Sequence, residues 1–169
     1  MSGSEEVPMS REKSKTLIIG IGNPYRNDDA VGVIVARRLK QKLGDRIAVL
    51  EQIGEGAALI EAWHSAEAVI IIDAVVSGAG SGTVHRFDVH AQTLPKGFLC
   101  YSTHAFGLAE AIEVARTLNQ LPPRLVVYGI EGKVFTAGTE LSREVERAAG
   151  EVLNRVLAEM KPSAAESDG

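Results

Sequence analysis

The chain has 169 residues, of which 45% are hydrophobic and 24% charged, and its formal net charge is -4. This length and balance predict one globular domain with its own apolar core. The charge lacks the basic excess typical of nucleic-acid-binding proteins, and the single cysteine excludes an intrachain disulfide and a four-cysteine zinc site. The polar N-terminus lacks the apolar core of a signal peptide, and no apolar run reaches the ~18 residues of a spanning helix. We therefore expect a cytoplasmic protein with no membrane insertion and no nucleic-acid partner.

Apolar runs and helical periods alternate along the chain, between a polar arm at 1–13 and a polar tail at 161–169 that are both predicted to be disordered. Residues 14–160 form the single predicted domain. In chain order, the expected elements are a strand at 16–21, a helix at 28–43, a strand at 46–52, a helix at 56–66, strands at 68–73 and 82–89, a helix at 104–119, a strand at 125–130 and a helix at 142–160. The strand at 82–89 alternates in polarity, which is typical of an edge strand.

Strands that are apolar on both faces and separated by helices predict a parallel sheet. We therefore expect an α/β fold, a single three-layer domain with a twisted, mostly parallel sheet of about five strands and helices on both faces. In such sheets ligands bind beyond the carboxyl ends of the strands. The polar residues that follow the strands are Asn23, Asp28, Asp29, Asp73 and Glu131. The segment 100–104, before the third helix, can reach the same edge.

The first candidate motif is GIGNPYRNDDAVG, from Gly20 to Gly32. It resembles a dinucleotide-binding loop, but Tyr25 occupies the place of the third glycine, and the lysine and serine of a P-loop are missing. Its acidic residues also occupy the helix start where a phosphate would bind. The motif therefore predicts no nucleotide or organic cofactor.

Two adjacent carboxylates open the first predicted helix. One is enough to cap a helix, so we interpret Asp28 as the cap and Asp29 as the side chain that points elsewhere. Asp73 closes a run of three isoleucines, where a carboxylate needs a partner or water. Its structural alternative is a turn before Ser77.

A histidine, His104, lies at the predicted start of the third helix. With Asp29 and Asp73 it makes a set of two oxygen ligands and one nitrogen ligand, which suits a borderline divalent ion and leaves a position open for substrate or water. The structural alternative for His104 is a partly buried histidine that is hydrogen-bonded to the backbone. A thiol nucleophile at Cys100 with His104 as its base is a further reading, although 101–103 resembles a loop and not a shared helix. The other three histidines, His64, His85 and His90, are predicted to be surface residues.

Four segments of the chain resemble the motifs of the nickel–iron hydrogenase maturation proteases. They are GIGNPYRNDDAVG, IIDAVVSG, STHAFGLAEAI and YGIEGKVFTAGTELSREVE, and they cover the chain from about Lys15 to Met160 in the family's order. The resemblance implies an endopeptidase on a sheet of about five strands. It also implies a partner, a hydrogenase large-subunit precursor whose short C-terminal extension is removed after nickel has been inserted.

The resemblance further implies how the metal is recognised. An acidic residue of the first motif, the aspartate of the third strand and the histidine carry over to Asp29, Asp73 and His104, as metal ligands and catalytic residues. The nickel is expected to come with the precursor, and Asp29 or Asp73 to act as the base. The first ligand is commonly Glu in the family, so the shorter Asp29 is expected to change the ligand geometry.

The remaining polar residues that follow the strands are assigned supporting roles. Asn23 and Asp28 are predicted to support the site or cap the helix, and Glu131 is assigned to a substrate loop. The family often has Pro where this chain has Gly132, so substrate contacts of that loop are expected to differ.

Two rival functions use the same motifs. Peptidyl-tRNA hydrolase shares a similar G-x-G-N-P opening, but it has a catalytic histidine near the first helix, where this chain has two aspartates, and it needs a basic face. A nonhydrolytic nickel-checkpoint protein would bind the loaded precursor without cutting it. The sequence cannot separate that protein from a protease, because both need the same three ligands.

Overall fold

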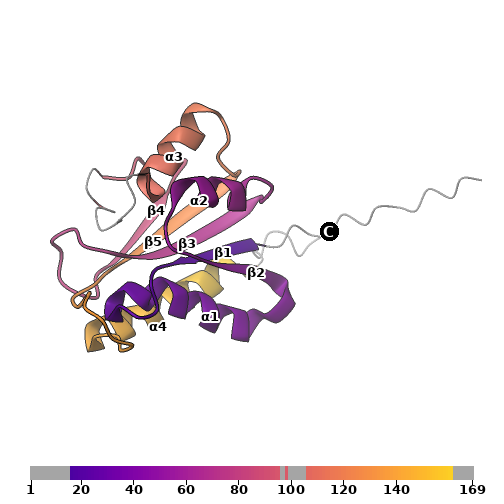
Figure 1. Cartoon of the computed structure of the whole chain (residues 1–169). Coiled ribbons are helices and arrows are strands. Elements are labelled where there is room, and N and C mark those ends of the chain that lie inside the picture. The colour runs from indigo at the N-terminus through magenta and orange to yellow at the C-terminus, as the bar shows by residue number, and fades with distance from the viewer. Residues whose placement is uncertain (1–15, 96–97, 99–105, 162–169) are drawn as a thin grey trace, which may run out of the picture.

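The computed structural model describes residues 16–95, 98 and 106–161. These residues form a five-stranded sheet in the order β2-β1-β3-β5-β4, with helices on both faces (Figure 1). The strands are β1 (Thr16–Ile21), β2 (Ile47–Gln52), β3 (Ala68–Val75), β4 (Val84–Asp88) and β5 (Arg124–Glu131). The helices are α1 (Val31–Leu43), α2 (Gly56–Trp63), α3 (Leu108–Thr117) and α4 (Arg143–Glu159), with short 3-10 turns η1 (Asn27–Ala30) and η2 (Gly44–Arg46).

Four of the strands are parallel, and only β4 runs antiparallel, at the edge beside β5. This confirms the predicted α/β class and the predicted edge strand. The predicted arm at 1–13 and all of the predicted tail except Lys161 lie outside the described residues. None of the helices in the described part is long and apolar enough to cross a membrane.

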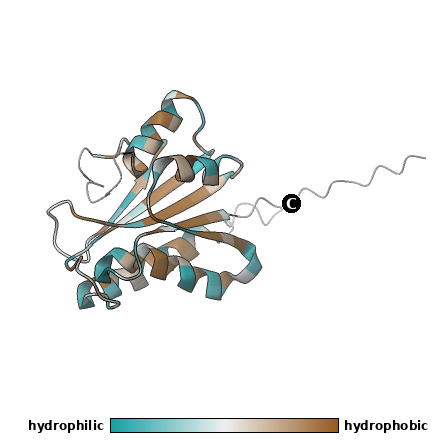
Figure 2. Ribbon diagram, in the orientation of Figure 1, coloured by the Kyte–Doolittle hydropathy of each residue, from teal (hydrophilic) through white to brown (hydrophobic). Residues whose placement is uncertain are grey.

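Alternate residues of the central strands enter two separate cores. Ile18, Ile70 and Val126 pack with α1 and α4 on one face. Ile19, Ile71 and Val127 pack with α2 and α3 on the other. Figure 2 shows the resulting hydropathy pattern, with hydrophobic strands between helices whose outer faces are largely hydrophilic. Both faces of the sheet are therefore covered, as the continuous apolar runs predict.

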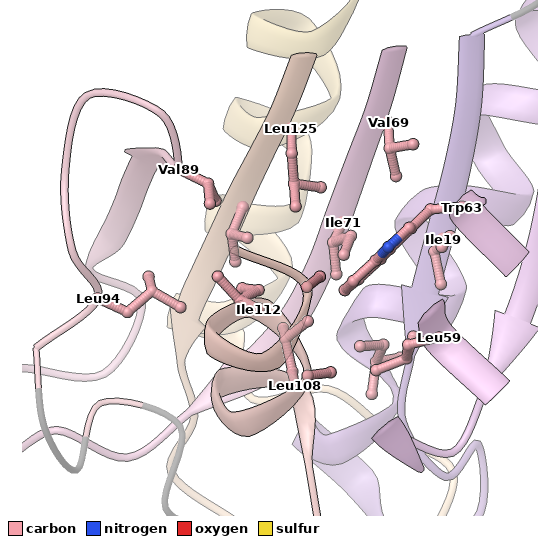
Figure 3. Close-up of a cluster of buried hydrophobic side chains, with 14 of the residues drawn as sticks. Ile19, Leu59, Trp63, Val69, Ile71, Val89, Leu94, Leu108, Ile112 and Leu125 are labelled. Carbon is pink, nitrogen blue, oxygen red and sulfur yellow. The ribbon is translucent and has the colours of Figure 1, made fainter. Parts of the chain in front are cut away.

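The core beneath α2 and α3 contains the only tryptophan of the chain. Trp63 and Leu59 of α2 lie over Ile19 and Ile71, beside Ile112 of α3, and all are fully buried (Figure 3). Burial of each large side chain of this kind stabilises the fold by about 1.5–3 kcal/mol.

The third helix begins later than the sequence predicts. It starts at Leu108, where the backbone N–H of Gly107 donates a hydrogen bond to Oε2 of Glu110 at 3.1 Å. That bond satisfies one of the free donors at the helix start, which the apolar pattern alone does not reveal. The prediction that His104 opens this helix is therefore wrong, and His104 itself lies outside the described residues.

Candidate active site

Two glycines bring the first motif onto the carboxyl ends of the strands. Gly22 has φ 147°, and a Cβ there would lie 1.9 Å from the carbonyl oxygen of Asp29. A Cβ on Gly32, in the first turn of α1, would lie 2.1 Å from the carbonyl oxygen of Ile72 in β3. Only glycine permits so close an approach. The start of α1 therefore lies directly against the end of β3, where Asp73 is found.

Asp29 is held at this edge by its own loop. The backbone N–H of Asn23 donates a hydrogen bond to Oδ2 of Asp29 at 2.9 Å, and Nη1 of Arg26 lies 3.8 Å from the same oxygen. Oδ1 of Asn23 in turn accepts a hydrogen bond from the backbone N–H of Tyr25 at 2.9 Å. The Asp29 side chain is 18% exposed, so it is oriented by the loop and still open to solvent.

Asp73 lies opposite Gly129 of β5 in the parallel ladder, near the end of β3. Burial and the negative charge of Asp29 raise the pKa of Asp73 well above its usual value, although a hydrogen bond from the backbone N–H of Ala74 opposes the shift. The structure therefore brings Asp29 and Asp73 close enough for their charges to repel. A carboxyl group with a raised pKa is suited to take up and release a proton. A cation beside the pair would relieve the repulsion.

Asp28 is buried and does not cap a helix. Its Oδ2 accepts hydrogen bonds from the backbone N–H groups of Lys133 and Val134, both at 2.8 Å, and from Oγ of Ser142 at 2.7 Å. Its Oδ1 accepts from the backbone N–H of Ser142 at 2.7 Å. Neither η1 nor α1 has a side-chain cap, so the predicted cap role is wrong. Asp28 instead anchors the loop between β5 and α4.

These bonds also set the charge of Asp28. Burial alone would raise its pKa, but the hydrogen bonds from Ser142, Val134 and Lys133 outweigh burial and lower the pKa. Asp28 is therefore an ionised structural group beside Asp29, and the two adjacent aspartates have different roles.

Glu131 is the last residue of β5, and its side chain is 1% exposed. Both of its carboxylate oxygens lie 3.1 Å from the backbone N–H of Ser77, the hydroxyl of Ser77 donates to Oε1, and Nε2 of His85 lies 3.1 Å from Oε1. The side chain therefore joins β5 to the β3–β4 loop and to β4. Its assignment to a substrate loop stays a prediction.

The three histidines that are not assigned to the predicted site differ in their exposure. His64 and His90 are exposed, as predicted. His85 is only partly exposed, because its side chain is 22% exposed and its ring packs edge-on against Phe98 with centroids 4.7 Å apart. The partner of His85 is 46 residues away in sequence, so no local pattern could have indicated it.

His104 and Cys100 lie outside the described residues, so neither the third predicted ligand nor the thiol alternative is tested. In the part of the chain that the structure describes, no three His, Cys, Asp or Glu residues form a group that could hold a metal ion. Of the three predicted ligands, the structure therefore describes only the two carboxylates, Asp29 and Asp73.

The model of the family described as hydrogenase maturation protease matches residues 33–159. The chain belongs to this family. The hydrogenase 2 maturation protease of Escherichia coli strain K12 is 27% identical over 157 residues, which cover 90% of this chain and 94% of that protein. The solved structure of the maturating endopeptidase HybD from E. coli, 27% identical, matches with a TM-score of 0.71 over 86% of this chain and 91% of that chain.

A second solved structure, the maturation protease HycI from Thermococcus kodakarensis KOD1, is 25% identical and matches with a TM-score of 0.67. It covers 90% of this chain and 96% of that chain. As a member of this family, the chain is an endopeptidase and therefore a hydrolase. Peptide hydrolysis needs a polarised carbonyl group and an activated water, and the pair of carboxylates is the part of the described site that suits this chemistry.

Proposed function

We propose that this protease removes the C-terminal extension of a nickel–iron hydrogenase large-subunit precursor after nickel has been inserted. In this proposal Asp29, Asp73 and His104 recognise the nickel ion that the precursor carries. The observation that supports it is the close packing of α1 on the end of β3, which brings Asp29 near Asp73, where burial and the charge of Asp29 raise the pKa of Asp73. Two repelling carboxylates at the carboxyl ends of parallel strands form a site that a divalent cation would stabilise.

The position of Phe106, two residues after His104, is compatible with a role for His104. The backbone N–H of Gly56 at the start of α2 donates a hydrogen bond to the carbonyl oxygen of Phe106 at 2.8 Å. That contact places Phe106 beyond the carboxyl end of β2. His104 precedes Phe106 by two residues, a chain length that spans at most about 7 Å. The position of His104 in the sequence is therefore compatible with a role at this edge of the sheet.

The carboxylates also provide the proton transfers of the reaction. The base takes a proton from the attacking water, the water oxygen bonds to the scissile carbonyl carbon, and the same proton then passes to the departing amine as the C–N bond breaks. Asp73 is the better candidate for this base, because its raised pKa makes it a stronger base than an ordinary carboxylate. Asp29, with backbone and arginine partners, is the better candidate for a ligand.

The test is cleavage of the precursor in its nickel-loaded and nickel-free forms, followed by mass spectrometry of the products. We expect loss of a C-terminal peptide from the loaded form only. Asp29→Asn, Asp73→Asn and His104→Ala should each reduce cleavage by at least about 100-fold, whereas the control Asp45→Asn should not change it. Asp45 is a suitable control because its carboxylate is fully exposed and belongs to η2, away from the site.

Each other result has a definite meaning. Equal cleavage of both precursor forms would reject recognition of nickel. Binding of the loaded precursor without any cleavage would support the nonhydrolytic checkpoint function.

A further inference from the structure

Four exposed apolar side chains follow the carboxyl ends of the four parallel strands, one after each strand. Ile53 follows β2, Tyr25 follows β1, Val76 follows β3 and Val134 follows β5, with exposed fractions of 67%, 71%, 37% and 37%. We call these four residues the rim strip. The other large apolar side chains that are exposed in the described part of the chain are Leu50 within β2, and Val114 and Leu118 at α3.

The order of the strands places the rim strip across the candidate active site. Along the sheet the strand ends follow one another as β2, β1, β3 and β5, and the two carboxylates belong to the middle pair. Asp29 lies in the connection after β1, and Asp73 lies near the end of β3. Neighbouring strands are about 4.8 Å apart, so the four ends span about 14 Å. An extended peptide of about four residues has the same length.

The loops that carry the rim strip are fixed by backbone hydrogen bonds. The N–H of Gly138 donates to the carbonyl oxygen of Tyr25 at 2.9 Å, and the N–H of Asp28 donates to that of Val134 at 2.9 Å. The N–H of Gly132 donates to the carbonyl oxygen of Val75, next to Val76, at 3.0 Å. The apolar side chains are therefore presented by a preformed frame, which lowers the entropy cost of binding.

We propose that the rim strip binds the C-terminal extension of the precursor, in extended conformation, through apolar side chains of that extension. This proposal rests on the proposed function, because it takes the same precursor as the substrate. The extension is the part of the precursor that must cross the two carboxylates for its junction to be cut. Apolar side chains gathered around a polar site indicate a binding surface. The strand ends that precede the four residues follow one another in a row, as the residues of an extended chain do.

The test compares Tyr25→Ser/Ile53→Ser with the control Leu118→Ser in the full-length protein. Leu118 is 59% exposed, close to the exposure of Tyr25 and Ile53, and it lies at α3. A labelled synthetic peptide with the sequence of the extension serves as the probe for binding. We expect the rim-strip variant to bind this peptide about tenfold more weakly or worse, and to show a raised KM with unchanged kcat on the loaded precursor. The control should behave as the wild type.

A precursor whose extension has Ser in place of its apolar residues identifies what the strip contacts. On that precursor the rim-strip variant and the wild type should have the same KM. A difference that persists would mean that the strip contacts another part of the precursor, and would overturn the assignment. Concentration-dependent dimers that the variant abolishes would assign the strip to a second copy of the chain and would also overturn it.

Failure of the proposed function gives a different result. If the wild type binds the peptide through the rim strip but cuts no precursor, the proposed cleavage function fails and the rim-strip proposal stands. If cleavage occurs and the variant equals the Leu118→Ser control in both assays, only the rim-strip proposal fails.

Discussion

The charge of Asp73 has an energetic cost that depends on pH. Its pKa in the folded chain is raised well above 3.8 by burial and by the charge of Asp29. Between the unfolded and folded pKa values, the folded state therefore binds more protons than the unfolded state. The free energy of unfolding consequently falls as pH rises through this window, and the cost is fully present above the folded pKa.

Removal of this carboxylate should therefore stabilise the protein while it abolishes function. We expect Asp73→Asn to have a higher Tm than the wild type at about pH 8, with the difference shrinking as pH is lowered toward 3.8, the unfolded value. Thermal unfolding followed by circular dichroism across this pH range measures it. The control Asp45→Asn has an exposed carboxylate and should show no such trend. A lower Tm for Asp73→Asn at neutral pH would contradict the raised pKa.

At the scale of secondary structure, the sequence predicts the central strands better than the helix ends. β1 has the predicted bounds, and β5 exceeds its predicted range by one residue at each end, because buried parallel strands form continuous apolar runs. The start of α3 is four residues later than predicted, because the cap that sets it depends on a glycine backbone. Local patterns thus predict elements that are defined by burial and miss ends that are defined by single hydrogen bonds.

The candidate site shows the same division between local and distant information. The position of Asp73 follows from the end of an apolar run. The role of Asp28 does not, since its partners lie 105 to 114 residues away in sequence. The same holds for Glu131, whose partners Ser77 and His85 are 54 and 46 residues away.

The packing of α1 on the strand ends provides a prediction for this element. Gly32→Ala would place a Cβ 2.1 Å from the carbonyl oxygen of Ile72 and 2.6 Å from that of Ile21, so α1 must move outward. We expect the free energy of unfolding to fall by about 3 kcal/mol. Because the same movement carries Asp29 away from Asp73, cleavage should fall as well. Urea unfolding and precursor cleavage measure the two effects.

The matched control is Gly150→Ala in α4, where nothing lies within 4 Å of the added Cβ. That substitution should leave cleavage unchanged and stabilise the helix by about 0.5–1 kcal/mol. If Gly32→Ala were as stable and as active as Gly150→Ala, close packing of α1 on the strand ends would not position the site.

At the scale of the whole molecule, one edge of the sheet collects segments from most of the chain. The first motif meets the β5–α4 loop through Asp28 and Ser142, and the β3–β4 loop is joined to β5 through Ser77 and Glu131. Two cores, one on each face, hold the strands that carry these loops. Asp29 and Asp73 therefore lie among loops that are joined to one another at this edge of the sheet.

This arrangement predicts how the whole protein responds to nickel. If the precursor supplies the metal and most of its ligands, Ni²⁺ alone should bind the free protease weakly, because Asp29 and Asp73 provide only two carboxylates and His104 one nitrogen. At a Ni²⁺ concentration equal to that of the protease, Tm should therefore change by no more than about 1 °C. The nickel-loaded precursor at the same concentration should protect the protease from unfolding, and Asp73→Asn should weaken that protection. A large rise in Tm with Ni²⁺ alone that is lost in Asp73→Asn would instead mean that the protease holds a metal ion of its own.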